Sequence, residues 1–208
     1  MAKFIQKFQN QSAFDAAEHQ YPNTSLVGTE IVFAMTAPAA FGGLTVKYNI
    51  EDPTVEVALF NGGGASSGSS ESSSESGGGG ALPTTMIVDG VSETPINTWR
   101  FETAGEHIVQ YEFADNVVPQ GFISTDAGAI PATEVIVGTD ITGISSQAFE
   151  IPLTSATCLS TTPPTIGDGS SFGDGSYNYP IYVPAESVAT YKAANIWTSL
   201  ESRIFAIQ

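Results

Sequence analysis

The sequence predicts a mainly β protein. We expect a small N-terminal α+β anchor, a flexible linker, a β-sandwich-like lead-in and a short solenoid with a helical C-terminal cap. Strand-like segments with alternating apolar residues recur in the second half of the chain. A Gly/Ser tract interrupts the chain at residues 62–80, and the segment from Cys158 to Ile207 ends in a proline-framed apolar run and a helix-like stretch.

Residues 1–61 form the predicted anchor. Residues 3–8 suit a short strand or arm, and Ser12 suits the N-cap of a helix over residues 12–19. Alternating or continuous apolar runs predict strands at residues 25–27, 30–35, 44–50 and 55–60. Because about 60 residues bury only a marginal core, we expect this unit to associate with another chain. Its candidate docking residues are aromatic: Phe4, Phe8, Phe14 and Tyr21.

Residues 62–80 consist of Gly, Ser, one Ala and two Glu, a composition typical of a flexible coil. A coil of this length spans roughly 24 Å on average. We interpret it as a tether between the anchor and a displayed head. A long surface loop inside one domain is the alternative.

The lead-in covers residues 81–116. Residues 86–88 and Val91 flank Asp89-Gly90, which is a strong hairpin sequence. Further strands are expected at 96–101 and 107–113. We expect Trp99 to pack in the core or between domains, with a ligand platform as the alternative.

Residues 117–208 form the predicted head, and a repeat in the low twenties organises it. Strand-like pieces at Tyr111, Val135 and Thr157 are separated by steps of 24 and 22 positions. Phe122, Phe149 and Phe172 follow them, with steps of 27 and 23. This period lies in the range of leucine-rich repeats. An ordinary β-sandwich with evenly spaced strands is the alternative.

The last segment predicts a cap for these coils. Pro180 and Pro184 frame a strand at 181–183, and residues 185–194 favour a helix with Val188 and Tyr191 on one face. Trp197 continues that face. We expect this stripe to cover the open end of the solenoid core.

The residues from Asp140 to Phe149 resemble a coil of the BspA-like leucine-rich repeats of gut-bacterial surface proteins. The stretches 158–164, 180–184 and 191–194 resemble the terminal cap of that family. The resemblance covers roughly residues 108–207 and implies a short leucine-rich-repeat head. The chain carries two to three coils where the family often has many.

The opening, over about residues 3–35, resembles the start of virion structural proteins in phages of gut Bacteroidales. This resemblance implies a protein of the virion surface, such as a capsid decoration, a head fibre or a tail-associated protein. Its expected partners are capsid or tail proteins and further copies of itself, with a trimer as the first expectation. A host-surface glycan or protein is a further expected contact. A bacterial surface adhesin or glycan-binding module with leucine-rich repeats is the alternative function.

Composition excludes several partners. The chain has 208 residues, with 6 Lys and Arg against 22 Asp and Glu, and a net charge of −16. Such a polyanion does not attract nucleic-acid phosphates or anionic lipid. No run of about 18 apolar residues predicts a membrane span. Residues 1–10 lack the apolar core of a signal peptide, so we expect no export by that route.

No catalytic pattern emerges, and we expect neither enzymatic activity nor a cofactor. His19 and His107 lie on opposite sides of the Gly/Ser tract, and the single cysteine, Cys158, suits a small buried hydrophobe better than a nucleophile. Asp168-Gly169 and Asp174-Gly175 suggest turns, with calcium binding as the alternative. We therefore predict no metal site. The head aromatic residues expected to pack or make contacts are Trp99, Phe122, Phe149, Phe172, Tyr191 and Trp197.

Overall fold

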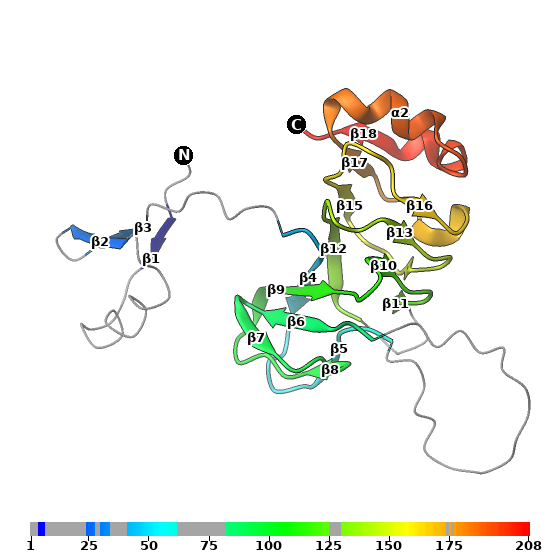
Figure 1. Ribbon diagram of the computed structural model, residues 1–208. Coiled ribbons are helices and arrows are strands. Elements are labelled where there is room, and N and C mark those ends of the chain that lie inside the picture. Colours follow the sequence, from blue (N-terminus) through cyan, green and yellow to red (C-terminus); the bar gives the residue numbers. More distant parts are fainter. Residues whose placement is uncertain are drawn as a thin grey trace, which may run out of the picture. The chain divides into compact units, whose positions relative to one another are not determined.

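A computed structural model describes residues 41–61, 82–124, 130–173, 175 and 177–208, together with three strands nearer the N-terminus (Figure 1). Contacts between residues divide the chain into two compact units, Met1–Ala40 and Phe41–Gln208. We describe each unit by itself.

The first unit contains three antiparallel strands in the order β1-β3-β2. Their bounds are β1 Phe4–Gln6, β2 Thr24–Val27 and β3 Glu30–Phe33. The strands predicted at 25–27 and 30–35 therefore form, and they pair with each other from Thr24↔Phe33 to Val27↔Glu30. The helix predicted at 12–19 lies outside the described residues.

The second unit is built on an eight-stranded mixed sheet, which confirms the mainly β prediction. In sheet order its strands are β18 (Ile204–Ala206), β17 (Ile181–Val183), β15 (Ser155–Cys158), β12 (Ala132–Val137), β4 (Leu44–Ile50), β9 (Gly105–Glu112), β6 (Thr85–Val88) and β7 (Val91–Glu93).

Strand β4 lies between β9 and β12 and pairs antiparallel with both. Its inward side chains, Leu44, Val46, Tyr48 and Ile50, are buried. The predicted domain boundary at residue 61 is therefore wrong, because residues 41–61 supply a central strand of the same sheet as residues 82–208.

The segments on either side of the Gly/Ser tract consequently belong to the same unit. On its N-terminal side, the Asn61 amide donates to the Phe122 carbonyl at 2.8 Å. On its C-terminal side, the Thr84 amide donates to the Glu112 carbonyl at 2.8 Å. Both Asn61 and Thr84 belong to the Phe41–Gln208 unit, so the interpretation of residues 62–80 as a tether between units is wrong. The segments on both sides of the tract belong to one unit, as the alternative interpretation requires.

The first step of the predicted repeat also needs correction. Tyr111 on β9 and Val135 on β12 are not neighbours in the ladder, because β4 separates their strands. Tyr111 instead pairs with Leu44, and Val135 pairs with Val46. The apolar alternation of residues 107–113 predicts a strand, and this segment does form β9. However, β9 pairs antiparallel with β4 and does not belong to the parallel ladder.

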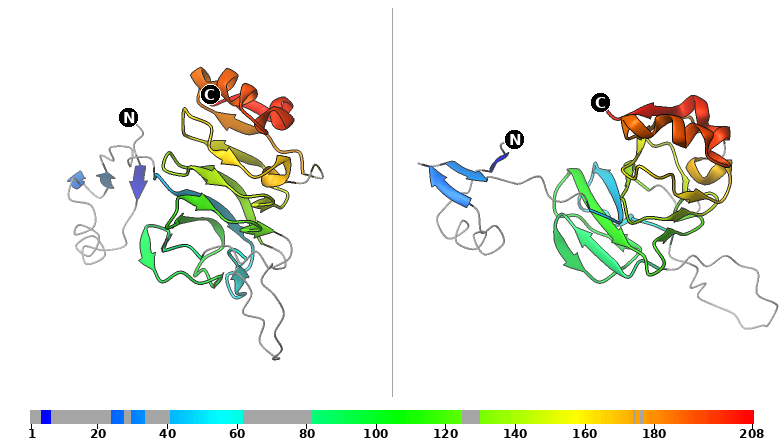
Figure 2. Two further views of the ribbon diagram at one scale, coloured as in Figure 1. Left: turned by 45° about the vertical axis from the view of Figure 1, so that its right-hand side comes forward. Right: turned by 45° about the horizontal axis from the view of Figure 1, so that its top comes forward.

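Beyond β4 the sheet becomes parallel. Val135 pairs with Ala156, Ala156 with Ile181 and Ile181 with Ile204. A second parallel ladder joins β10 (Val117–Val118), β13 (Gly143–Ile144) and β16 (Thr165–Ile166), and a third joins β11 (Ile123–Ser124) to β14 (Phe149–Glu150). The ladders run side by side up the unit and enclose its core (Figure 2).

The lead-in forms a hairpin at the predicted position. Asp89 and Gly90 have φ values of 49° and 86°, the positive values that a tight β-hairpin turn requires. The neighbouring strands β5 (Val57–Ala58) and β8 (Thr98–Trp99) pair with each other and are shorter than the predicted 55–60 and 96–101.

The C-terminal segment carries short helices between β17 and β18. After β17 follow the 3-10 helix η3 (Ala185–Ser187), the helix α2 (Val188–Ala193) and the 3-10 helix η4 (Trp197–Arg203). The helix ends at Ala193, and Ile196 has a positive φ of 67°. The predicted stripe is buried at Tyr191 and Trp197, while Val188 packs partly buried against the core.

We expect residues 41–208 to fold as an isolated fragment and residues 62–208 not to fold cooperatively. The shorter fragment lacks β4, so β9 and β12 lose their shared partner. The core also loses six buried apolar side chains, because Leu59 and Phe60 are removed together with the four of β4. Far-UV circular dichroism and urea unfolding of both fragments will test this. Equal stability of the two fragments would contradict the placement of β4.

We also expect stability to fall at high pH. Burial raises the pKa of the Cys158 thiol from its ordinary 9.0 to about 12, and it raises the pKa of the Tyr48 and Tyr111 phenols above 10.0. Because these pKa values are higher in the folded chain, the stabilisation is complete below about pH 9 and is lost as the pH rises toward 12. Each group should contribute a slope of about 1.4 kcal/mol per pH unit above its unfolded pKa.

Urea unfolding between about pH 8 and 11 measures this effect. The variant Cys158→Val should lose the part of the slope that begins near pH 9 and keep the tyrosine part that begins near pH 10. A free energy of unfolding that does not change over this range would contradict the burial of these groups.

Candidate functional site

Among the described residues, no group of three or more His, Cys, Asp or Glu side chains is arranged to hold a metal ion. His107 is buried, with Nδ1 2.7 Å from Asp89 Oδ2 and Nε2 2.9 Å from the Thr103 carbonyl oxygen. Asp89 Oδ1 also accepts a hydrogen bond from the Ile108 amide at 2.9 Å. His107 therefore fastens the Asp89-Gly90 turn to β9, as a packing residue would.

Two further candidates also have structural partners. Cys158 is fully buried on β15, and its raised pKa keeps the thiol protonated. Asp168 caps the 3-10 helix η2 (Gly169–Phe172) by accepting a hydrogen bond from the Ser170 amide at 2.8 Å. The hydrogen bond from the Ser170 hydroxyl is the main cause that lowers the pKa of Asp168. Asp174, the other residue proposed for calcium, lies outside the described residues.

The predicted head aromatics lie in the core. Phe149, Phe172 and Trp197 form a column, with ring centroids 5.5 and 5.4 Å apart. Tyr191 meets Trp197 edge to face at 4.9 Å, and Phe122 stacks on Phe60 at 5.0 Å. These side chains pack the interior and are themselves not exposed to a ligand. Trp99 is partly buried against the core on β8.

The predicted docking residues of the anchor are not located in the same detail. Phe4 lies on β1, whose backbone alone is described, and Phe8, Phe14 and Tyr21 lie outside the described residues.

The feature that sequence reasoning missed is the solvent face of the large sheet. One row of registered residues crosses all eight strands and is uncharged. From β18 to β7 it consists of Phe205, Tyr182, Thr157, Ile136, Thr45, Gln110, Ile87 and Ser92. With strands about 4.8 Å apart, the row is about 34 Å long. We call this row and the residues flanking it on the same face the contact face.

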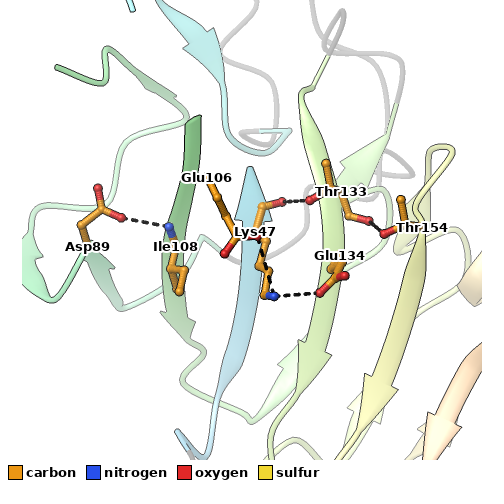
Figure 3. Close-up of polar contacts among 7 residues, drawn as sticks. All are labelled: Lys47, Asp89, Glu106, Ile108, Thr133, Glu134 and Thr154. Atoms are coloured by element: carbon orange, nitrogen blue, oxygen red, sulfur yellow. Dashed lines mark hydrogen bonds and ion pairs between the residues drawn. The ribbon is translucent and has the colours of Figure 1, made fainter. Parts of the chain in front are cut away.

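A charged row runs beside it (Figure 3). Lys47 Nζ lies 3.0 Å from Glu134 Oε2 and 3.9 Å from Glu106 Oε2. The pKa of Lys47 is raised, mainly by its hydrogen bond to Glu134. Partly exposed ion pairs of this kind contribute about 1 kcal/mol or less to the free energy of unfolding. These side chains therefore determine the charge of this face more than they stabilise the fold.

Aromatic and aliphatic groups project from the same face. Phe205 is 50% exposed, and its ring centroid lies 6.3 Å from that of Tyr182. On the antiparallel half, Ile108 is 39% exposed. The period-2 alternation of each strand identifies such outward residues. Their alignment into one row follows only from the register.

Comparison with known proteins supplies no identity, because no family model matches the chain and no curated protein matches it. In the part of the chain that the structure describes, no helix is long and apolar enough to span a membrane. The described geometry offers an extended uncharged row with exposed apolar groups on one face of the sheet, and such a surface suits contacts with a macromolecule.

A pair of substitutions distinguishes core residues from surface residues. Phe172→Ala should cost about 3–5 kcal/mol of unfolding free energy, because the side chain is fully buried in the aromatic column. Phe205→Ala on the contact face should cost about 1 kcal/mol or less. Urea unfolding measures both changes. Similar losses from the two variants would contradict the division between core and contact face.

Proposed function

We propose that this chain is a non-enzymatic structural protein of a phage virion, such as a capsid decoration, a head fibre or a tail-associated protein. The residues before Phe41 attach it to the particle, and the remaining unit displays a binding head at the virion surface. The observation that carries this proposal is the separation of a small unit, Met1–Ala40, from a compact unit whose sheet has a solvent-facing side with exposed apolar groups. The sequence resemblance of the opening to phage structural proteins gives the proposal its context.

We further infer that the parallel part of the head is a short leucine-rich-repeat solenoid. The register steps along the main ladder support this inference: 21 positions from Val135 to Ala156, then 25 to Ile181 and 23 to Ile204. The apolar residues of the motif that resembles a BspA-like coil are all buried, namely Ile141, Ile144, Ala148 and Phe149.

Affinity in this proposal comes from many contacts spread over the contact face. Its uncharged row supplies apolar and hydrogen-bonding groups, and the carboxylates beside it select against acidic surfaces. The expected partners are a capsid or tail protein and a host-surface glycan or protein. We expect copies of the chain to associate with closed symmetry, with a trimer as the first candidate.

A bacterial surface adhesin or glycan-binding module is the second candidate function. The neighbouring rings of Tyr182 and Phe205 favour it, because exposed aromatic rings supply platforms for sugar. Selective glycan-array binding that Phe205→Ala abolishes, with no chain found in purified particles, would favour this function over the first.

Deletion of residues 1–40 should abolish incorporation into particles while leaving the head folded. Particles assembled with the full chain or with residues 41–208 are purified and analysed by mass spectrometry, and circular dichroism checks the fold of the fragment. Incorporation of the fragment at the level of the full chain would refute the role of the first unit.

A substitution on the contact face tests the second half of the proposal. Thr157→Arg places a long cation at the middle of the uncharged row, so it should block the face without disturbing the core. Particle incorporation should persist, and binding to host cells should fall. Thr84→Arg, at an exposed site outside the row, is the control. Unchanged host binding by both variants would remove the contact face from the proposal.

A further inference from the structure

A groove of about 640 Å³ opens where β4 ends and β12 begins. Its walls come from the end of β4 and the following turn, from the segment leading through β5, and from the start of β12. The lining residues used below are Asn49, Glu51, Val55, Glu56, Val57 and Thr133. A backbone hydrogen bond from the Asn49 amide to the Pro131 carbonyl, at 2.9 Å, joins two of these walls.

The groove combines apolar walls with carboxylates. Val57 and Ala58 are partly buried and pack against the core, and Val55 is 51% exposed. Glu51 and Glu56 line the same groove, and both residues are exposed. An apolar surface next to carboxylates matches a guest with an aliphatic stem and a cationic end.

The ion pairs found among the described residues leave these carboxylates without a cation. Arg100, which the β5–β8 register places opposite Glu56, takes part in none of those ion pairs, and neither does Lys192. Glu56 instead accepts a hydrogen bond from the Thr98 hydroxyl. Lys47 pairs with Glu106 and Glu134 on the contact face. Arg203 is buried in the cap, where it donates to the carbonyl oxygens of Tyr179 and Phe172. None of the ion pairs found among the described residues involves a carboxylate of the groove.

The groove is continuous with the contact face. Asn49 and Thr133 line it, and Asn49 is the register partner of Glu106, which takes part in the charged row. A partner lying on the contact face therefore reaches the groove without a gap. A second copy presenting the same face would bring carboxylates against carboxylates.

We propose that this groove receives a lysine or arginine side chain from an extended segment of a protein partner that lies on the contact face. The inference rests on the proposed function of that face. The aliphatic stem packs against Val55 and Val57, and the cationic end lies between Glu51 and Glu56. Arginine suits the site particularly well, because its planar guanidinium forms paired hydrogen bonds with carboxylates.

The test uses the ¹⁵N-labelled full chain and a capped pentapeptide with one central arginine between Gly and Ser residues. We expect chemical-shift changes at residues 49–58 and 131–133, with a dissociation constant of about 1 mM. The same peptide with citrulline, which keeps the shape and removes the charge, should bind at least about fivefold more weakly.

A matched pair of double variants separates a site from general attraction to an acidic protein. Glu51→Gln with Glu56→Gln should weaken binding of the arginine peptide about fivefold or more. Glu186→Gln with Glu201→Gln removes the same charge from exposed positions of the cap and should change it less than about twofold. Equal losses in both variants, equal binding of the citrulline peptide, or an absence of shifts at the groove would each overturn the proposal.

The groove inference and the proposed role of the contact face can fail independently of each other. If the peptide does not bind while Thr157→Arg still lowers host binding, the groove inference fails and the role of the contact face stands. If the peptide binds at the groove while Thr157→Arg has no effect, the contact-face role fails and the groove remains a cation site.

Discussion

The antiparallel pairing of β4 with both β9 and β12 is the constraint on which the rest of the head depends. A parallel ladder cannot begin from an unpaired buried edge, because the outer strand would leave amide and carbonyl groups without partners. Strand β4 closes the edge of β12 and also joins it to β9, which in turn pairs with the hairpin strand β6. Close backbone contacts extend this junction: a Cβ on Gly138 would lie 2.2 Å from the Gly42 carbonyl oxygen, so a larger residue there would displace the chain.

The interior shows how buried polar groups are accommodated around that junction. The Tyr48 hydroxyl donates to the Leu59 carbonyl at 2.7 Å and lies 2.9 Å from the Tyr111 hydroxyl, so both phenols are satisfied inside the core. Near the C-terminus, two side chains donate hydrogen bonds to backbone carbonyls of residues 160–164. Trp197 Nε1 donates to the Pro164 carbonyl, and the Tyr191 hydroxyl donates to the Ser160 carbonyl. Among the described residues, no buried side-chain nitrogen or oxygen lacks a partner.

This architecture has a direct functional consequence. The polar groups with strongly shifted pKa values are buried tyrosines and a cysteine, and burial keeps them protonated where a reaction would need them exposed. The exposed chemistry is instead spread along the face of the sheet, as an uncharged row beside carboxylates. The proposed binding function rests on this distribution, because contact area and complementary charge govern macromolecular recognition. The groove at the end of β4 also combines apolar walls with carboxylates.

Individual strands and turns can be predicted from the sequence alone. Asp89-Gly90 specified its hairpin because few residues tolerate positive φ, the alternation over 44–50 specified a strand with one buried face, and the prolines at 180 and 184 framed β17. Only the tertiary structure decided which strands pair. The apolar alternation of β9 fits a parallel or an antiparallel neighbour equally well. The sequence therefore predicts Tyr111 in the parallel repeat with Val135, whereas it pairs antiparallel with Leu44. Likewise, the composition of residues 62–80 indicates flexibility but not whether the flanking segments belong to one unit or two. The contact face follows the same logic: alternation identifies outward side chains, whereas the long-range hydrogen bonds that set the register align them into a surface.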